Sequence, residues 1–358
     1  MGKIKKQMGD LERSPKTLLE NDFMPGTHHH EYGMYGEIKI FAGTASQELA
    51  EEVACYLEAQ LSEHEVTHFA NDNLWIQLKE SVRGQDVYFI QSTAKPVHRN
   101  LMELLIMLQT LRLDSAGRVT AVVPYLCYTR SDKKDKPRVP ITARLVADMI
   151  EVAGADRYMT LDMHAGQIQG FFSIPGDVLS AFYILANEIE KILPEMRNPV
   201  VVATDLGFAK KGRNFASRIH APIAFVEKRR AKEDDNTEAL TLIGDVKDRD
   251  VIIVDDEVDT GGSITKAINV VKEYGARDVY LTFVHPIFSG DAAERLAESP
   301  IKKIITTNTV LIPPEKAKLL EEKLVICSVA PLLAEVILRA HEGRSVGEML
   351  NEKYARTP

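Results

Sequence analysis

The sequence is poor in the features that mark disulfide-rich, membrane-spanning and nucleic-acid-binding proteins. Its 358 residues include three cysteines, Cys55, Cys127 and Cys327, without CxxC spacing, which argues against a disulfide framework or a zinc site and favours a reducing compartment. No apolar run approaches the length of a membrane span, and the N-terminus lacks the apolar stretch of a signal peptide. Acidic residues outnumber basic ones, 52 to 44, so a general basic footprint for nucleic acid is missing. We therefore expect a cytoplasmic protein with neither nucleic-acid nor membrane partners.

The length and the pattern of the chain indicate an extension followed by two domains. Residues 1–36 are polar and show no sustained period, so we interpret them as a mobile N-terminal extension. The three adjacent histidines His28, His29 and His30 in that extension are interpreted as solvated rather than as a metal tract. At roughly 150 residues per domain, the remainder is long enough for two domains with their own cores. We place them at residues 37–185 and 186–358.

From Glu37 onward, short apolar or β-branched runs alternate with segments of helical period. One helical segment begins with Thr44 and Gln47 spaced as in a capping box. Another has Pro140 near its start and Gly154 just past its end. Alternation of strand and helix over this length predicts an α/β fold with mainly parallel sheets flanked by helices.

Acidic residues follow several of the predicted strands. Asp162 ends YMTLD, Asp205 ends VVVATD, and Asp255 and Asp256 end VIIVDD. In open α/β sheets, ligands bind beside the carboxyl ends of parallel strands. A single acid at a strand end is usually a turn residue, but several of them favour a shared ligand site.

The segment VIIVDDEVDTGGSI, residues 251–264, is the most informative part of the sequence. A buried strand runs into two acids and then into Asp259-Thr260-Gly261-Gly262-Ser263 before a helix. Glycines let a ligand approach the backbone, and amides at a helix N-terminus bind phosphate. Carboxylates can accept hydrogen bonds from sugar hydroxyls, so the segment fits a phosphosugar better than it fits an ordinary capped turn.

These residues match the phosphoribosyl-binding loop of phosphoribosyltransferases and of phosphoribosyl diphosphate synthetases. From about Ile38 to Tyr354 the chain resembles the second family, the ribose-phosphate diphosphokinases. The matching stretches are ESVRGQDVYFIQST, VVPYLCYTRSDKK, LDMHAGQIQGFFSIPGD, APIAFVEKRR, DDEVDTGGSI and VAPLLAEVILRAHEGRSV. The resemblance implies two phosphoribosyltransferase-like domains, of which the second carries the ribose 5-phosphate loop.

The resemblance also implies an activity and a set of reacting residues. The enzyme would transfer the β,γ-diphosphate of ATP to the anomeric hydroxyl of ribose 5-phosphate, giving phosphoribosyl diphosphate and AMP. His164 and Asp205 would hold Mg²⁺ on the nucleotide phosphates, and Lys228 and Arg230 would be catalytic. Residues 231–239, AKEDDNTEA, would form a loop that closes over the site. The ribose 5-phosphate site would comprise Arg230, Asp255, Asp256, Asp259, Thr260, Gly261, Gly262 and Ser263.

Three further expectations follow from the resemblance. ATP would be held at a site that combines adjacent subunits, so we expect a homo-oligomer, with dimers assembling into a hexamer. The ATP-binding residues would be Phe69, Asn71, Asp72, Asn73, Arg130, Ser131 and Asp132. Arg83, Asp177 and Ser328 fall where many members of the family bind phosphate or ADP as effectors.

Several positions depart from the usual family pattern and keep alternatives open. Asn71 and Asn73 in the loop after Phe69, and Ser131, touch the region that recognises the base. Phe208 stands where a glycine is usual, and Gly166 replaces a polar residue. A non-catalytic regulatory paralogue that assembles with active subunits is therefore an alternative.

Two other interpretations fit the sequence less well. A phosphoribosyltransferase would share only the phosphoribosyl loop, not the match over both domains. The stretch GFAKKGRN, residues 207–214, nearly spells a P-loop, but Arg213 and Asn214 stand where Lys and Ser or Thr are required.

Overall fold

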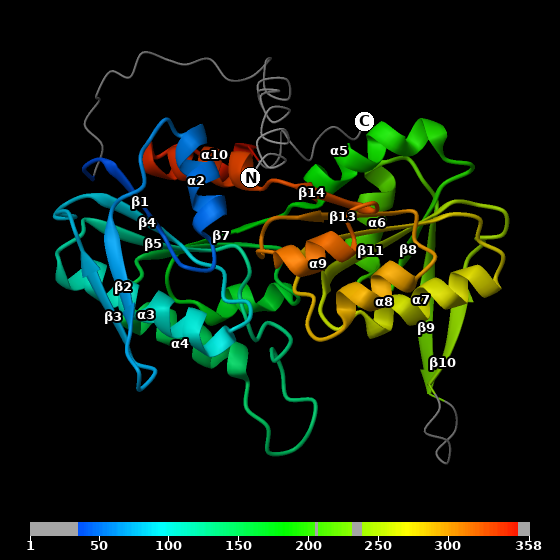
Figure 1. Cartoon of the computed structure of the whole chain (residues 1–358), viewed down its shortest axis with the longest axis horizontal. Helices are drawn as coiled ribbons and strands as arrows, with labels where there is room; N and C mark the ends of the chain where they lie inside the picture. Colours follow the sequence, from blue (N-terminus) through cyan, green and yellow to red (C-terminus); the bar gives the residue numbers. More distant parts are fainter. Residues whose placement is uncertain (1–34, 205–206, 231–237, 350–358) are drawn as a thin grey trace, which may run out of the picture. The chain divides into compact units, whose positions relative to one another are not determined.

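The computed structural model describes residues 35–204, 207–230 and 238–349, and at 228–230 and 238–239 it describes the backbone alone. Most of the predicted N-terminal extension, and Asp205, therefore lie outside the described residues. Within them, the strands form two large sheets and a separate hairpin (Figure 1).

The first sheet has five parallel strands in the order β1-β4-β5-β6-β7. Its strands are β1 (Ile38–Ala42), β4 (Asp86–Ile90), β5 (Arg118–Val123), β6 (Arg157–Leu161) and β7 (Gly176–Leu179). A hairpin of β2 (His64–His68) and β3 (Leu74–Leu78) stands beside α3. The helical elements of this part are α2 (Gln47–Tyr56), α3 (Val97–Leu113), α4 (Thr142–Ala153) and the 3-10 helix η2 (Gly166–Phe171).

The second sheet has seven strands in the order β10-β9-β8-β11-β12-β13-β14, and only the β9–β10 pair is antiparallel. Its strands are β8 (Val200–Ala203), β9 (Ile223–Arg230), β10 (Glu238–Ile243), β11 (Val251–Val258), β12 (Val279–Pro286), β13 (Lys303–Thr307) and β14 (Leu324–Cys327). The helices are α5 (Phe182–Ile192), α6 (Ala209–Arg218), α7 (Gly262–Glu273), α8 (Ala292–Glu298), α9 (Pro314–Leu319) and α10 (Ala330–His341), with the 3-10 turn η3 (Leu193–Glu195). The prediction of an α/β fold with mainly parallel sheets is confirmed.

The apolar pattern of the sequence explains why the strands are central. Residues Val251–Val254 of β11 are all buried, as expected for a parallel strand covered on both faces. Helix α4 buries one stripe and ends at Gly154, whose φ of 117° is the left-handed conformation that glycine adopts readily. Helix α2 begins differently from the expected capping box. Thr44 instead donates from its amide and hydroxyl to Glu103 of α3, at 2.8 and 2.5 Å.

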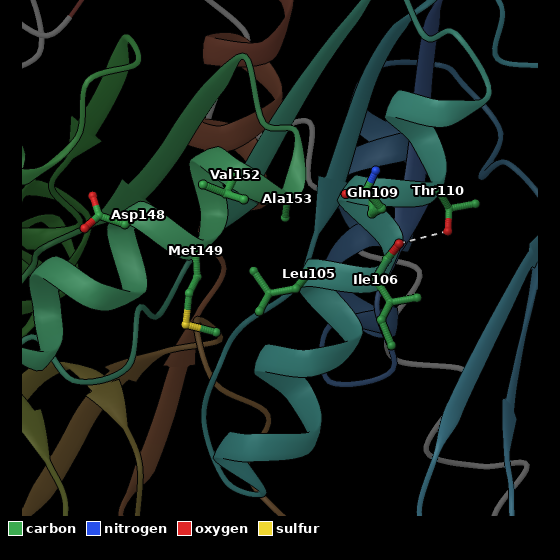
Figure 2. Close-up of a pocket in the computed structure, with 8 residues that line it drawn as sticks. All are labelled: Leu105, Ile106, Gln109, Thr110, Asp148, Met149, Val152 and Ala153. Atoms are coloured by element: carbon green, nitrogen blue, oxygen red, sulfur yellow. Dashed lines mark hydrogen bonds between the residues drawn. The ribbon is translucent and has the colours of Figure 1, made fainter.

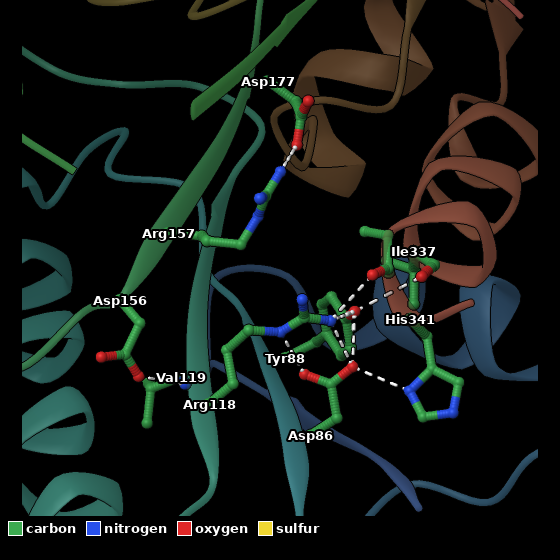
Figure 3. A network of polar contacts seen from close by, with 10 residues as sticks. Asp86, Tyr88, Arg118, Val119, Asp156, Arg157, Asp177, Ile337 and His341 are labelled. Atoms are coloured by element: carbon green, nitrogen blue, oxygen red, sulfur yellow. Dashed lines mark hydrogen bonds and ion pairs between the residues drawn. The ribbon is translucent and has the colours of Figure 1, made fainter. Parts of the chain in front are cut away.

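The last described helix returns to the first sheet. Helix α10 packs beside α2 (Figure 1), and its side chains share one core cluster with Ile40 and Tyr88 of the first sheet. A buried polar network joins the same elements: Asp86 accepts hydrogen bonds from Arg118, Tyr88 and His341 (Figure 3).

The division into residues 37–185 and 186–358 stays a prediction. Its boundary falls within α5, which contacts β12 and β13 of the second sheet. Among the described residues, no helix is long and apolar enough to cross a membrane.

Candidate functional site

Polar side chains that follow strands of both sheets meet at β11. His164 follows β6 and lies 2.8 Å from Asp256, while Arg130, in the loop after β5, forms an ion pair with Glu257. Lys211 of α6, which follows β8, lies 3.9 Å from Asp256. The carboxyl ends of β5, β6 and β8 therefore converge on β11, as the rule for ligand sites in parallel sheets leads one to expect.

His164 and Asp256 form one of the links between the two sheets at this site. The histidine Nδ1 faces the carboxylate Oδ2, and the side chains are 41% and 5% exposed. The hydrogen bond to Asp256 raises the pKa of His164. Burial alone would raise the pKa of Asp256, but the hydrogen bond and charge of His164, together with Lys211, lower it. The pair therefore keeps Asp256 ionised beside a polarised imidazole.

Lys211 of α6 contacts the backbone next to His164. Its Nζ donates to the Met163 carbonyl at 3.0 Å and lies 5.7 Å from the centre of the Phe208 ring. Phe208 is buried and packs against Phe182. The stretch that nearly spells a P-loop thus forms a helix that supplies a lysine, and Phe208 joins the core rather than filling the space beside His164.

Asp255 points to a different partner from its neighbour. Its Oδ2 accepts a hydrogen bond from Thr204 at 2.8 Å, and its Oδ1 accepts one from the Asp256 amide at 2.8 Å. Burial, and then the charge of Asp256, raise the pKa of Asp255. Asp255 and Asp256 are thus neighbours in β11 that engage different partners, Thr204 and His164.

The loop after β11 has the geometry of an anion site. Gly261, at φ 75°, is the N-cap of the twelve-residue helix α7, whose first turn carries no acidic residue. Thr260 and Ser263 are exposed, and Asp259 is partly exposed. The loop therefore presents hydroxyls and helix-start amides to solvent, an arrangement that suits a phosphate.

The residues expected to hold ATP lie in two segments. The first segment is Arg130–Asp132, in the loop after β5. The Arg130 side chain is 56% exposed, whereas its partner Glu257 is 5% exposed. Asp132 accepts a hydrogen bond from Gln167, and the Ser131 hydroxyl accepts one from the Thr142 amide.

The other segment is the tip of the β2–β3 hairpin. Phe69 is 51% exposed there, and the Asn73 amide donates to the Asn71 side chain. Asp72 pairs with Arg99 at 3.0 Å and borders a hollow of about 720 Å³ that Tyr125 and Tyr128 also line. No hydrogen bond among the described residues joins the hairpin tip to Arg130–Asp132.

For three positions that the family resemblance leads us to expect in the reaction, the structure describes no side chain. Asp205 lies outside the described residues. Lys228 and Arg230 lie in β9, opposite Leu240 and Glu238 of β10, and the described part includes only their strand. Most of the loop expected to close over the site, residues 231–237, is also outside it.

The three residues expected to bind effectors have separate surroundings. Arg83 lies before β4 and is exposed, and Asp177 of β7 pairs with Arg157 at 2.7 Å. Ser328 precedes α10 and bonds with Glu52 and Asn308.

Sequence reasoning missed Glu257 and Lys211 as parts of the site. Glu257 lies in the acidic stretch that the sequence analysis singled out. The alternation of side chains along an extended strand could have indicated that Glu257 and Asp256 have different partners. Lys211 had no comparable signal, since its contacts depend on how α6 packs.

Comparisons with known proteins agree along most of the chain. Residues 38–154 match the model of the N-terminal domain of ribose phosphate pyrophosphokinase, and residues 233–351 match that of the phosphoribosyl synthetase-associated domain. A ribose-phosphate pyrophosphokinase of Clostridium tetani is 45% identical over 315 residues, covering 88% of this chain and 97% of the relative. One from Listeria ivanovii is 45% identical over 314 residues, covering 87% and 97%.

A solved structure is similar as well. The crystal structure of phosphoribosylpyrophosphate synthetase from Mycobacterium smegmatis has a TM-score of 0.81 and 38% identity, and the match covers 86% of this chain and all of that one.

Proposed function

Because this chain belongs to the ribose-phosphate pyrophosphokinase family, we propose that it transfers the β,γ-diphosphate of ATP to ribose 5-phosphate. One observation carries the proposal: His164, Arg130 and Lys211 all contact acidic residues of β11. The carboxyl end of β11 leads directly into the loop Asp259–Ser263, whose geometry suits a phosphate. Side chains that can bind a triphosphate and a loop that can bind a sugar phosphate therefore lie at the same end of β11.

The reaction divides into tasks that residues of this chain can perform. The loop Asp259–Ser263 binds the 5-phosphate and a ribose hydroxyl, and Arg130 binds the triphosphate. The anomeric hydroxyl then attacks the β-phosphorus in line; its O–P bond forms as the bond to the AMP oxygen breaks, and the hydroxyl proton is released. Lys228 and Arg230 neutralise the charge that develops on the transferred group.

We propose Mg²⁺ as the metal of this reaction, held on the triphosphate by His164 and Asp205. Mg²⁺ usually keeps several waters and binds through a few protein groups together with substrate phosphates. The half-exposed imidazole of His164 fits such a site, since Asp256 engages only its Nδ1. When bound, the metal would withdraw negative charge from the phosphate oxygens.

The alternative is a regulatory paralogue without activity. The burial of Phe208 speaks for the enzyme, because the side chain that departs from the family pattern packs into the core beside Phe182. The changes at Asn71, Asn73 and Ser131 concern the choice of base.

We further propose that phosphate or ADP acts as an effector at Arg83, Asp177 and Ser328.

Self-association into dimers and a hexamer is part of the proposal. A hollow of about 460 Å³ between α3 and α4 is lined largely by apolar side chains, among them Leu105, Ile106 and Met149 (Figure 2). Val152 beside it is 84% exposed, and Leu145 of the same helix 56%. Exposed apolar patches of this kind mark interaction surfaces, and a second copy of the chain would cover it. Val152→Glu would then reduce the mass measured by light scattering.

A panel of nucleotides tests the activity and the donor together. Purified protein is incubated with ribose 5-phosphate, Mg²⁺ and ATP, dATP, GTP or CTP, and the nucleoside monophosphate is quantified. We expect sugar-dependent release of AMP above that of the other monophosphates. Absence of sugar-dependent release from any donor would favour the regulatory paralogue, whose further test is a change in activity on mixing with an active family member. We propose that these reactions take place in the cytoplasm.

A further inference from the structure

We propose that Asp256 is a positioning residue that orients His164 toward the metal-bound triphosphate, and that it does not bind the ribose. This inference rests on the proposed function, because it assigns a role within the same site. It changes the assignment expected from the family pattern, in which Asp256 belonged to the ribose 5-phosphate group.

The geometry of the pair defines one orientation of the imidazole. Asp256 Oδ2 lies 2.8 Å from His164 Nδ1, so Nδ1 carries the proton and donates a hydrogen bond to the carboxylate. The other ring nitrogen, Nε2, is thereby left as the acceptor that would bind the metal. Carboxylates commonly hold metal-binding histidines in this way, fixing the tautomer and the ring orientation.

Lys211 makes the arrangement rigid from a second direction. Its ammonium donates to the Met163 carbonyl, one residue before His164, and lies 3.9 Å from the same oxygen of Asp256. The peptide that carries His164 is therefore held by α6, while its ring is held by β11. The Lys211 ammonium therefore places a positive charge beside the Asp256 carboxylate, whose side chain is only 5% exposed.

The same burial argues against a role in sugar binding. A residue that binds ribose must offer an oxygen to a sugar hydroxyl that arrives from solvent. The Asp256 side chain is only 5% exposed, and its Oδ2 is already engaged by His164. Asp259, three residues further, is partly exposed and lies in the loop itself. We therefore assign sugar contacts to Asp259 and its loop, and assign Asp256 to the histidine.

The test separates metal binding from sugar binding in the full-length protein. Free Mn²⁺ is measured by electron paramagnetic resonance during titration of the protein in the presence of a non-hydrolysable ATP analogue. The variants are Asp256→Asn, His164→Gln and their combination, with Asp245→Asn as the control. Asp245 is an exposed acid paired with Arg249 at 3.5 Å, so its variant removes the same charge away from the site. Thermal melting shows whether each variant is folded.

We expect Asp256→Asn to weaken Mn²⁺ binding by about 10–100-fold, the usual effect of removing such a partner of a metal ligand. The double variant should bind no more weakly than His164→Gln alone, because Asp256 acts through the histidine. The KM for ribose 5-phosphate should change by less than about twofold, since no sugar contact is lost. Lys211→Met provides a second variant acting on the same carboxylate, with a smaller loss in the same direction.

Two results would overturn the assignment. One is unchanged Mn²⁺ affinity in Asp256→Asn. A KM for ribose 5-phosphate raised by about tenfold or more in the same variant would be the signature of a lost sugar contact. The other is full additivity of the two substitutions in Mn²⁺ binding, which would mean that Asp256 does not act through His164. Because the titration needs no turnover, it decides whether Asp256 supports metal binding through His164 even for a protein that makes no phosphoribosyl diphosphate, which would contradict only the proposed function.

Discussion

His341 Nδ1 lies 2.8 Å from Asp86 Oδ2, although 255 residues separate them in the chain. Arg118 donates to both oxygens of the same carboxylate, at 2.7 and 2.6 Å (Figure 3). It also donates to the Ala340 carbonyl at 3.1 Å. The Asp86 side chain has no exposed surface. The network therefore links α10 to the first sheet through the buried Asp86 carboxylate, which is stabilised by its hydrogen bonds to Arg118 and His341.

Removing Arg118 should destabilise the protein severely. Arg118→Met leaves the Asp86 carboxylate buried without its main cation, and breaking such a pair typically costs about 3–5 kcal/mol. Arg112→Met is a matched control, because Arg112 pairs with Asp156 at 3.1 Å but is itself 56% exposed, and such pairs contribute less than about 1 kcal/mol. Urea unfolding measures both changes in the free energy of unfolding. An equal decrease in the free energy of unfolding in both variants would show that the buried network stabilises the protein no more than an exposed ion pair does.

The same carboxylate should make stability depend on acidity. Burial alone would raise the pKa of Asp86, but the hydrogen bonds from His341 and Arg118 outweigh it and lower the pKa. A group whose pKa is lowered on folding stabilises the native state above its unfolded pKa, about 3.9, and loses this contribution as pH falls through the folded pKa. The free-energy difference between wild type and Asp86→Asn, from urea unfolding, should therefore be largest near neutrality and shrink in acid. A difference independent of pH would contradict this.

Glu257 should control how well Arg130 binds the nucleotide. The buried carboxylate holds a guanidinium that is more than half exposed and free to contact a ligand as well. Glu257→Gln removes the charge that fixes Arg130, so we expect the KM for ATP to rise about threefold to tenfold, a partial loss of a charge-assisted hydrogen bond. The KM for ribose 5-phosphate should stay unchanged. Steady-state kinetics that showed the reverse pattern would place Glu257 at the sugar.

Lys228 should act on the transition state rather than on substrate binding. Lys228→Ala should lower kcat by about 10²–10³-fold, the usual effect of losing one such electrostatic contact, with little change in either KM. Lys318→Ala, at an exposed position in α9, serves as the control for removal of a lysine charge. Near-normal turnover in Lys228→Ala would remove this residue from the catalytic group.

Much of the fold could be predicted because local patterns determine it. Buried runs such as Val251–Val254 became central parallel strands, and Gly154 ended its helix as its position indicated. The expected capping box at Thr44 was wrong because Glu103, 59 residues away, captured that side chain.

The partners within the site could not be predicted in the same way. The acids at the end of VIIVDD were recognised as part of a ligand site, but the sequence does not say which of them faces the ligand. That depends on β11 extending through Val258 and on which residues the loops after β5 and β6 bring against each face. Asp256 and Glu257 were therefore engaged by His164 and Arg130, contacts between segments far apart in the chain.

Following the products by ³¹P nuclear magnetic resonance tests the central claim most directly. Protein, Mg²⁺, ATP and ribose 5-phosphate are mixed, and the phosphorus signals are recorded with time, with a sample lacking the sugar beside it. Transfer of the intact diphosphate predicts AMP and a new sugar diphosphate appearing in equal amounts, only when the sugar is present. Formation of ADP with a singly phosphorylated product, or of AMP and free diphosphate regardless of the sugar, would contradict it.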